Sequence, residues 1–166
     1  MIARNLTKSD LQLRVNWMNN PKVYRSMHFD VPVLMENTIR WYENNIDNDK
    51  RTDLAFEDDG VIVAFGGLTN IDRLLNKAEL YIFVDPEIQK SGIGTKATKS
   101  LCKYGFDVLK LEKIYLETNE DNVVAQRVYE KCGFVLEGKL RNEYRSKNGS
   151  LLCRLYYGLL KGELNE

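Results

Sequence analysis

Hydrophobic residues recur at helical spacing in two stretches near the start of the chain. The first stretch predicts a helix that begins at a cap at Thr7 and ends near Met18, before Asn19-Asn20-Pro21. The second stretch runs over residues 33–45, and its apolar face consists of Met35, Ile39, Tyr42 and Ile46. The first third of the chain is therefore predicted to be largely helical.

Extended segments follow in the middle of the chain. Strands are predicted over residues 52–57 and 61–69, which flank an Asp58-Asp59-Gly60 hairpin turn, and over residues 78–84. The pair Gly66-Gly67 lies inside the second of these strands. Glycines in a strand predict a bulge or a close approach of another part of the chain.

Helices and strands alternate in the last part of the chain. The pattern predicts a helix over 95–109, a strand over 113–118, a helix over 122–131, and strands over 134–137 and 151–159. Gly133 is placed to end the second of these helices in a left-handed conformation. This order predicts one mixed α/β domain over residues 1–166, with an antiparallel half and a βαβ-like half.

Charge and length narrow the classes of function. The 166 residues include 24 Lys and Arg against 24 Asp and Glu, so the formal net charge is zero. A protein that binds bulk nucleic acid would carry a basic excess, so we expect no nucleic-acid partner. No apolar run approaches the ~20 residues that cross a bilayer, and the first residues lack the apolar segment of a signal peptide. We therefore expect a cytoplasmic protein with no membrane partner.

The cysteine and histidine content argues against several kinds of site. Cys102, Cys132 and Cys153 are too widely spaced for a zinc knuckle and odd in number, which predicts reduced thiols. With His28 as the one histidine, we expect neither a metal site nor a Ser-His-Asp triad. Cys132 has no histidine partner and is expected to be a packed apolar residue rather than a nucleophile.

A glycine-rich loop between the strand at 78–84 and the helix at 95–109 is the most informative stretch. Backbone N–H groups at a helix start favour a bound anion, and Gly92 and Gly94 would let a phosphate approach the main chain closely. A plain connecting loop would explain the same glycines. A Walker A loop would need Gly-Lys-Ser/Thr, which Gly94-Thr95-Lys96 does not supply.

A dinucleotide-binding loop is a further interpretation of the same residues. Residues 92–97 match the fingerprint G-x-G-x-x-G/A literally. However, the seven residues 85–91 separate this fingerprint from its strand, and only 69 residues follow Ala97. That leaves little room for a second mononucleotide-binding half, but an NAD-binding module stays an alternative.

Two separate motifs resemble one known family. The loop matches Gln/Arg-x-x-Gly-x-Gly/Ala through Gln89, Gly92 and Gly94. The second motif consists of Asn122, Ala125, Tyr129, Lys131, Gly133 and Phe134. In this order and on these elements, the motifs are similar to those of GNAT-superfamily N-acetyltransferases of the RimJ/RimL-like branch. The resemblance implies a mostly antiparallel mixed sheet that is flanked by helices and splayed open between strands 4 and 5. It also implies an additional first strand near residues 2–6.

The resemblance implies acetyl-CoA as co-substrate, with no metal, and it assigns roles to residues of this chain. Its pyrophosphate would be held by Gln89, Lys90, Ser91, Gly92, Ile93, Gly94 and Thr95. The main chain of Ile82, Phe83 and Val84 would pair with the pantetheine arm and supply an oxyanion donor. Asn122 would cap its helix and contact the cofactor, although capping alone would explain it. Tyr129 would act as general acid and protonate the departing thiolate.

The general base is open between three possibilities. Ala78-Glu79 matches a Glu of the related branch, and Glu79 shares a strand face with Tyr81 and Phe83 by alternation. Glu117, on the opposite strand, is a second candidate, and ordered water is a third. Either carboxylate would also fit a solvated strand face without a catalytic role.

The acceptor is expected to be a small-molecule amine. By resemblance, its site would be built from residues 17–47 and 138–156. It would include Trp17, Asn19, Met27 and Trp41, which are similar to residues of two subgroups. One subgroup acetylates ribosomal-protein N-termini, and the other acetylates nucleotide-linked amino sugars. The stretch 107–138 also resembles spermidine acetyltransferases. We prefer the amino sugar, because its base and hydroxyls suit an entry segment rich in aromatic and amide groups.

Other acceptors and other classes of function remain as alternatives. A polyamine enzyme would be expected to show a stronger acidic cluster than the one that residues 36–51 provide. Relatives often carry Asp where Cys153 stands, which weakens any transfer of acceptor contacts. A non-catalytic acyl-CoA sensor is an alternative of a different class. The sequence is compatible with a homodimer and does not determine the oligomeric state.

Overall fold

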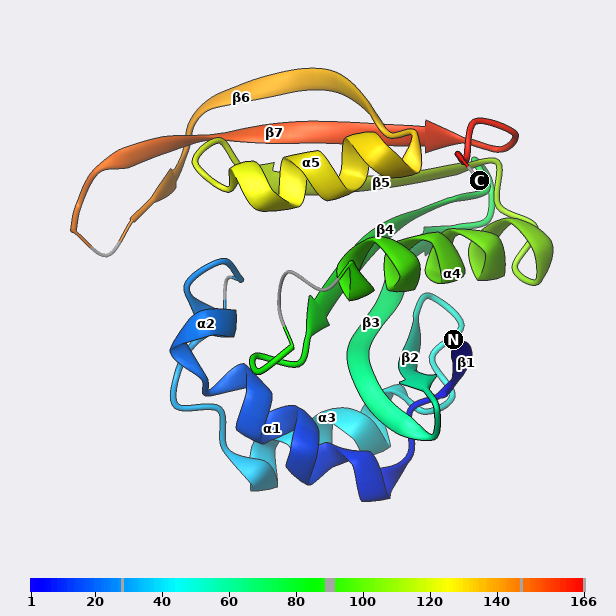
Figure 1. Ribbon diagram of the computed structural model, residues 1–166, viewed down its shortest axis with the longest axis vertical. Coiled ribbons are helices and arrows are strands. Elements are labelled where there is room, and N and C mark those ends of the chain that lie inside the picture. The colour runs from blue at the N-terminus through cyan, green and yellow to red at the C-terminus, as the bar shows by residue number, and fades with distance from the viewer. Residues whose placement is uncertain (28, 89–91, 147, 166) are drawn as a thin grey trace.

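A mixed sheet forms the centre of the computed structural model, which describes residues 1–27, 29–88, 92–146 and 148–165. Within these residues seven strands form one sheet in the order β1-β2-β3-β4-β5-β7-β6 (Figure 1). The strands are β1 (Ile2–Asn5), β2 (Thr52–Asp58), β3 (Val61–Asp72), β4 (Lys77–Val84), β5 (Lys113–Asn119), β6 (Val135–Arg145) and β7 (Leu151–Leu160). The helices are α1 (Leu11–Met18), α2 (Pro21–Tyr24), α3 (Met35–Asn45), α4 (Ile93–Asp107) and α5 (Val123–Cys132), and a 3-10 turn, η1 (Lys8–Asp10), precedes α1.

The sheet divides between β4 and β5. These two strands are parallel and pair over three residue pairs, the last of which joins Glu79 and Tyr115. Beyond that point β4 stays paired with β3 as far as Val84, and β5 stays paired with β7 as far as Asn119. Because each strand follows its own antiparallel neighbour, the two diverge. The predicted splay between strands 4 and 5 and the predicted first strand are both confirmed.

Helices cover both faces of the sheet (Figure 1). On one face α4 and α5 contribute residues such as Leu101 and Cys132 to the larger hydrophobic core. On the other face α1, α2 and α3 cover β2, β3 and β4, and Trp17 and Val23 join a second core around Phe65. No helix in the described parts of the chain is both long and apolar enough to cross a membrane.

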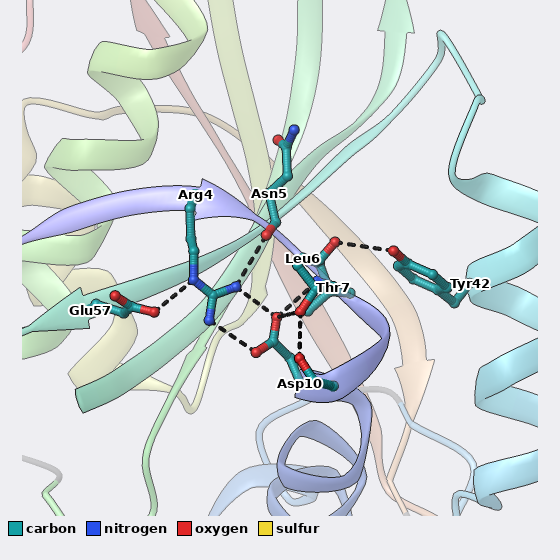
Figure 2. A network of polar contacts seen from close by, with 8 residues as sticks. Arg4, Asn5, Leu6, Thr7, Asp10, Tyr42 and Glu57 are labelled. Carbon is teal, nitrogen blue, oxygen red and sulfur yellow. Dashed lines mark hydrogen bonds and ion pairs between the residues drawn. The ribbon is translucent and has the colours of Figure 1, made fainter. Parts of the chain in front are cut away.

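A polar network attaches the start of the helical layer to β1 (Figure 2). Arg4 donates hydrogen bonds to both Asp10 oxygens, at 2.7 and 3.0 Å, and to Glu57, at 2.6 Å. The backbone N–H and the hydroxyl of Thr7 each donate to Asp10 Oδ2 at 2.8 Å. Burial alone would raise the pKa of Asp10, but the bonds from Arg4 and Thr7 outweigh it and lower that pKa. The predicted cap at Thr7 therefore acts through Asp10, and the first turn is η1.

Two elements differ from the sequence-based expectation. β6 extends over 11 residues, although the pattern predicted a strand at 134–137. Most of β6 is exposed on both faces, so its charged residues show no alternation with apolar ones. The short helix α2 was not predicted, and Asn20 caps it by accepting a hydrogen bond from Lys22 N at 3.0 Å.

Gly66 and Gly67 allow a close approach rather than a bulge. Pairing with β2 and β4 continues without a shift through both residues. A Cβ on Gly67 would lie 2.3 Å from Thr52 O and 2.7 Å from Cε1 of Tyr81. The glycine therefore leaves the space that the Tyr81 ring needs above the sheet.

Candidate active site

The divergence of β4 and β5 creates a cleft, which we call the β4–β5 cleft, with a volume of about 390 Å³. Its walls come from the end of β4, the start of α4, the end of β5, one face of α5, and the segment that contains α2. The lining residues are Lys22, Val23, Ser26, Met27, Ile82, Phe83, Val84, Gly92, Gly94, Thr95, Thr98, Glu117, Thr118, Asn122, Val124, Ala125, Val128 and Tyr129. Many of the residues that the sequence predicted for cofactor binding are thus brought together.

The start of α4 opens onto this cleft through its two glycines. Gly92 is the N-cap and has a left-handed φ of 81°, which a residue with a side chain rarely adopts. A Cβ at Gly92 would have nothing within 4 Å, and one at Gly94 would lie 3.9 Å from Val84 and Val128. The free N–H groups of the first helical turn are therefore accessible to an anion.

The remaining loop residues divide into three groups. Thr95 lines the cleft. Ile93 packs its side chain into the larger core, so a cofactor contact of Ile93 would involve its main chain. Gln89, Lys90 and Ser91, which were also predicted to hold a pyrophosphate, lie outside the described residues.

The β4 edge offers main-chain groups along the cleft. After Glu79, β4 has no pairing with β5 among the described residues, so one edge of this segment is open. Ile82 and Val84 are half-buried and line the cleft. The Phe83 side chain is 5% exposed, with ring centroids 5.7 Å from Phe29 and 5.9 Å from Phe65. Phe83 therefore supports the wall, and its main chain is the part that can pair with a ligand.

Tyr129 projects from α5 into the cleft. Its ring packs against Phe134 and Tyr157, with centroids 5.8 and 6.2 Å away. Burial, with smaller contributions from Cys132 and Cys102, raises the pKa of Tyr129 to about 12. The phenol therefore stays protonated at neutral pH and is placed to donate a proton in the cleft.

Asn122 occupies the N-cap of α5, the helix that also carries Tyr129. Its side-chain oxygen accepts a hydrogen bond from Ala125 N at 3.2 Å. This bond satisfies one of the free N–H groups of the helix start. The predicted capping role is confirmed, and its cofactor contact stays a prediction that its place in the cleft lining supports.

The two carboxylates considered as a base occupy different positions. Glu79 lies where β4 and β5 are still paired, accepts a hydrogen bond from Asn70 at 2.7 Å, and is absent from the described cleft lining. Glu117 lines the cleft, and its Oε2 lies 3.4 Å from Nε of Arg154. Glu117 is therefore the carboxylate closer to a reacting group in the cleft.

The four residues predicted to bind the acceptor are not gathered in one place. Trp17 is 6% exposed and packs on Phe65 at 5.0 Å. Asn19 pairs with the main chain of Val33, donating at 2.9 Å and accepting at 2.7 Å. These two side chains support the helical layer.

Trp41 and Met27 complete this set. Two guanidinium groups pack on the Trp41 ring, with Cζ of Arg14 at 4.6 Å and Cζ of Arg51 at 4.9 Å from its centroid. It lines a different hollow, between α3 and β2. Met27 alone among the four lines the cleft.

A second cavity adjoins the cleft, and most of its lining residues lie in the two stretches, 17–47 and 138–156, that we expected to form the acceptor site. This adjoining cavity has a volume of about 480 Å³. Its lining residues are Tyr24, Arg25, Met27, Phe29, Asp30, Asn119, Asp121, Tyr144, Ser146, Asn148 and Leu152. Met27 belongs to both cavities, and β5 passes from one into the other between Thr118 and Asn119. Within the described residues, no group of three His, Cys, Asp or Glu side chains could hold a metal ion.

Comparison with known proteins decides the family. A family model described as an acetyltransferase (GNAT) domain matches residues 1–135. This chain belongs to the GNAT acetyltransferase family.

Relatives of this GNAT chain include polyamine enzymes. It is 31% identical over 141 residues to a spermidine N(1)-acetyltransferase of Escherichia coli K12, covering 85% of this chain and 76% of that protein. It is 33% identical over 105 residues to a putative ribosomal N-acetyltransferase, YdaF, of Bacillus subtilis, covering 63% and 57%. A crystal structure of a Vibrio cholerae spermidine N-acetyltransferase in complex with CoA and spermine is similar, with a TM-score of 0.92 and 25% identity over 98% and 96% of the chains.

The family assignment fixes the reaction class. The chain is an acetyl-CoA-dependent N-acetyltransferase, and acetyl-CoA is its co-substrate. The features of the β4–β5 cleft fit that co-substrate, because the open α4 start can receive phosphates and the open β4 edge can pair with a pantetheine arm. The dinucleotide-binding and non-catalytic interpretations are thereby set aside.

Proposed function

We propose that the acceptor amine of this N-acetyltransferase is a polyamine such as spermidine or spermine. The observation that carries the proposal is the adjoining cavity. It meets the β4–β5 cleft at Met27 and includes two carboxylates, Asp30 and Asp121, against one guanidinium, Arg25. A cationic chain that enters this cavity would find an excess of negative charge in its lining, next to the cleft.

Aromatic side chains strengthen this match. Tyr24, Phe29 and Tyr144 also line the adjoining cavity. Aromatic faces attract ammonium groups, and the rings suit the aliphatic carbons between them. A polyamine combines both kinds of group in one chain.

The relatives support the same acceptor. The E. coli relative is named a spermidine N(1)-acetyltransferase, and the V. cholerae neighbour was solved with spermine. The nucleotide-linked amino sugar that the sequence favoured has no comparable support. The carboxylates that favour a polyamine here, Asp30 and Asp121, are not among the acidic residues of 36–51 that we judged too weak a cluster.

We assign the proton transfers to two residues of the cleft. When bound, acetyl-CoA supplies an acyl thioester that an amine can attack, with a thiol as the leaving group. Glu117 takes a proton from the attacking amine at a carboxylate oxygen, directly or through water. Tyr129 holds a proton on its hydroxyl and would donate it to the departing thiolate. The unpaired edge of β4 would supply a backbone N–H to the oxygen that gains charge.

The test is acetyl-CoA consumption across a panel of acceptors. The panel contains spermidine, spermine, a nucleotide-linked 4-amino sugar and peptides with ribosomal-protein N-termini. We expect kcat/KM for the two polyamines to exceed that for the others by roughly tenfold or more. Faster turnover of the amino sugar or of a peptide would overturn the polyamine assignment and leave the acetyltransferase assignment intact.

A further inference from the structure

One buried polar atom in the adjoining cavity has no hydrogen-bond partner in the part of the chain that the structure describes. Among the described residues, Asn119 Oδ1 is buried and accepts no hydrogen bond. The residue is 8% exposed and lies in the cavity lining. A buried carbonyl oxygen without a donor is costly unless a ligand or water supplies one.

The rest of Asn119 is held firmly. It pairs with Arg154 on β7, and its main-chain oxygen accepts hydrogen bonds from Asn122 N at 3.0 Å and from Gln126 Nε2 at 3.4 Å. By contrast, Asn148 in the same cavity uses its side-chain oxygen within its own turn, where Ser150 N donates at 3.0 Å. The unpaired oxygen of Asn119 is therefore a specific feature of this position.

The side chains of Asn119 and Glu117 lie close together along β5. The two residues are separated by one position on β5, so their side chains leave the same face, with Cα atoms about 6.6 Å apart for a strand rise of ~3.3 Å per residue. A three- or four-carbon linker between two amine nitrogens spans a comparable distance. If the reacting amine lies at Glu117, the next nitrogen of a polyamine lies near Asn119.

We propose that Asn119 Oδ1 accepts a hydrogen bond from the internal ammonium group of the polyamine and selects acceptors that carry one. This inference rests on the proposed polyamine function and assigns a specificity-determining residue within it. An ammonium group has N–H donors to offer, and the carbonyl oxygen is an acceptor. An aliphatic chain that lacks the internal nitrogen leaves the buried oxygen unpaired.

The experiment compares spermidine with 1,8-diaminooctane, in which a methylene replaces the internal nitrogen. We expect the wild-type enzyme to acetylate spermidine with a kcat/KM roughly tenfold or more above that for 1,8-diaminooctane. In Asn119→Leu this preference should fall below about threefold, mainly through loss of spermidine turnover. Asn119→Asp keeps an oxygen acceptor and should retain or enlarge the preference. Asn16→Leu, on the exposed side of α1, is the matched control and should keep the wild-type preference.

Each other outcome overturns the inference. Equal losses for both acceptors in Asn119→Leu would show a general effect on the cavity and would leave the polyamine function standing. No preference in the wild type, or loss of preference in Asn119→Asp, would also contradict the role of Asn119. Turnover of neither acceptor by the wild type would overturn the polyamine function and this inference with it.

Discussion

The β4–β5 cleft and the adjoining cavity meet at Met27. They differ in whether the main chain or the side chains form the binding surface. The cleft relies on main-chain features, namely the start of α4 at Gly92 and the open edge of β4. The adjoining cavity relies on side chains from three separated places: the segment after α2, the end of β5, and the β6–β7 hairpin. A main-chain site tolerates side-chain variation and suits a co-substrate that the whole family shares. A side-chain site can change its acceptor by substitution at a few positions.

The largest loss of activity is expected in the β4–β5 cleft, at Tyr129. We predict that Tyr129→Phe lowers kcat about 100- to 1,000-fold, because a protonated hydroxyl in the cleft is lost while the packing on Phe134 and Tyr157 remains. Coenzyme A affinity, measured by titration calorimetry, should change less than about twofold. An unchanged kcat would remove Tyr129 from the mechanism.

The next effect separates the two carboxylates. We predict that Glu117→Gln lowers kcat/KM for spermidine by roughly 10- to 100-fold. Glu79→Gln, the matched control, should change it less than about threefold, because Glu79 lies at the closed end of the cleft and bonds Asn70. Steady-state kinetics of both variants would decide the matter, and the reverse ranking would return the base to Glu79.

A smaller effect is expected in the adjoining cavity. The double variant Asp30→Asn with Asp121→Asn should raise the KM for spermidine roughly tenfold and leave the KM for acetyl-CoA unchanged. Asp107→Asn at the exposed end of α4 is the control for a lost surface charge. A rise in both Michaelis constants would show that the two cavities do not act separately.

The smallest effect is expected at Asp10, which attaches the helical layer to β1. It concerns the stability of the fold and not the reaction. Asp10→Asn should lower the free energy of unfolding by about 1–2 kcal/mol at neutral pH, because the bonds from Arg4 and Thr7 are weakened. The pKa of Asp10 is lowered from its ordinary 3.8, so the folded state binds fewer protons than the unfolded state and gains stability as pH rises through this range. The difference between wild type and variant should thus be full above about pH 5 and shrink as pH falls below 3.8.

Denaturant unfolding at several pH values measures this difference. Identical acid profiles of the two proteins would contradict the role of Asp10. A large loss of activity at neutral pH in the folded variant would show that the network does more than attach the helical layer.

The contrast between the two cavities also explains what the sequence could predict. The motif with Gly92 and Gly94 and the motif with Asn122 and Tyr129 are local, and the family resemblance that they carry predicted both walls of the cleft and the splayed sheet. Gly133 ends α5 with a left-handed φ of 102°, as expected from a glycine that follows an amphipathic helix. Local patterns of this kind can be recognised in the sequence without knowledge of the tertiary fold.

For the acceptor, the resemblance suggested the stretches 17–47 and 138–156, but most of the individual residues of the adjoining cavity were not predicted. Asp30, Asn119 and Tyr144 come together through the tertiary fold, and nothing in their local sequence shows it. The prediction of Trp17 as an acceptor contact came from a resemblance to acetyltransferase subgroups, and in the structure its side chain is buried against Phe65. A small-residue motif encodes a turn, whereas an aromatic residue fits a core and a binding site equally well.

The most direct test of the account is a crystal structure of this protein with coenzyme A and spermidine bound together. The account predicts the pantetheine arm along the open edge of β4, the phosphates at Gly92, and the polyamine in the adjoining cavity beside Asp30 and Asp121. Spermidine bound elsewhere, with the adjoining cavity closed or filled by other side chains, would contradict it.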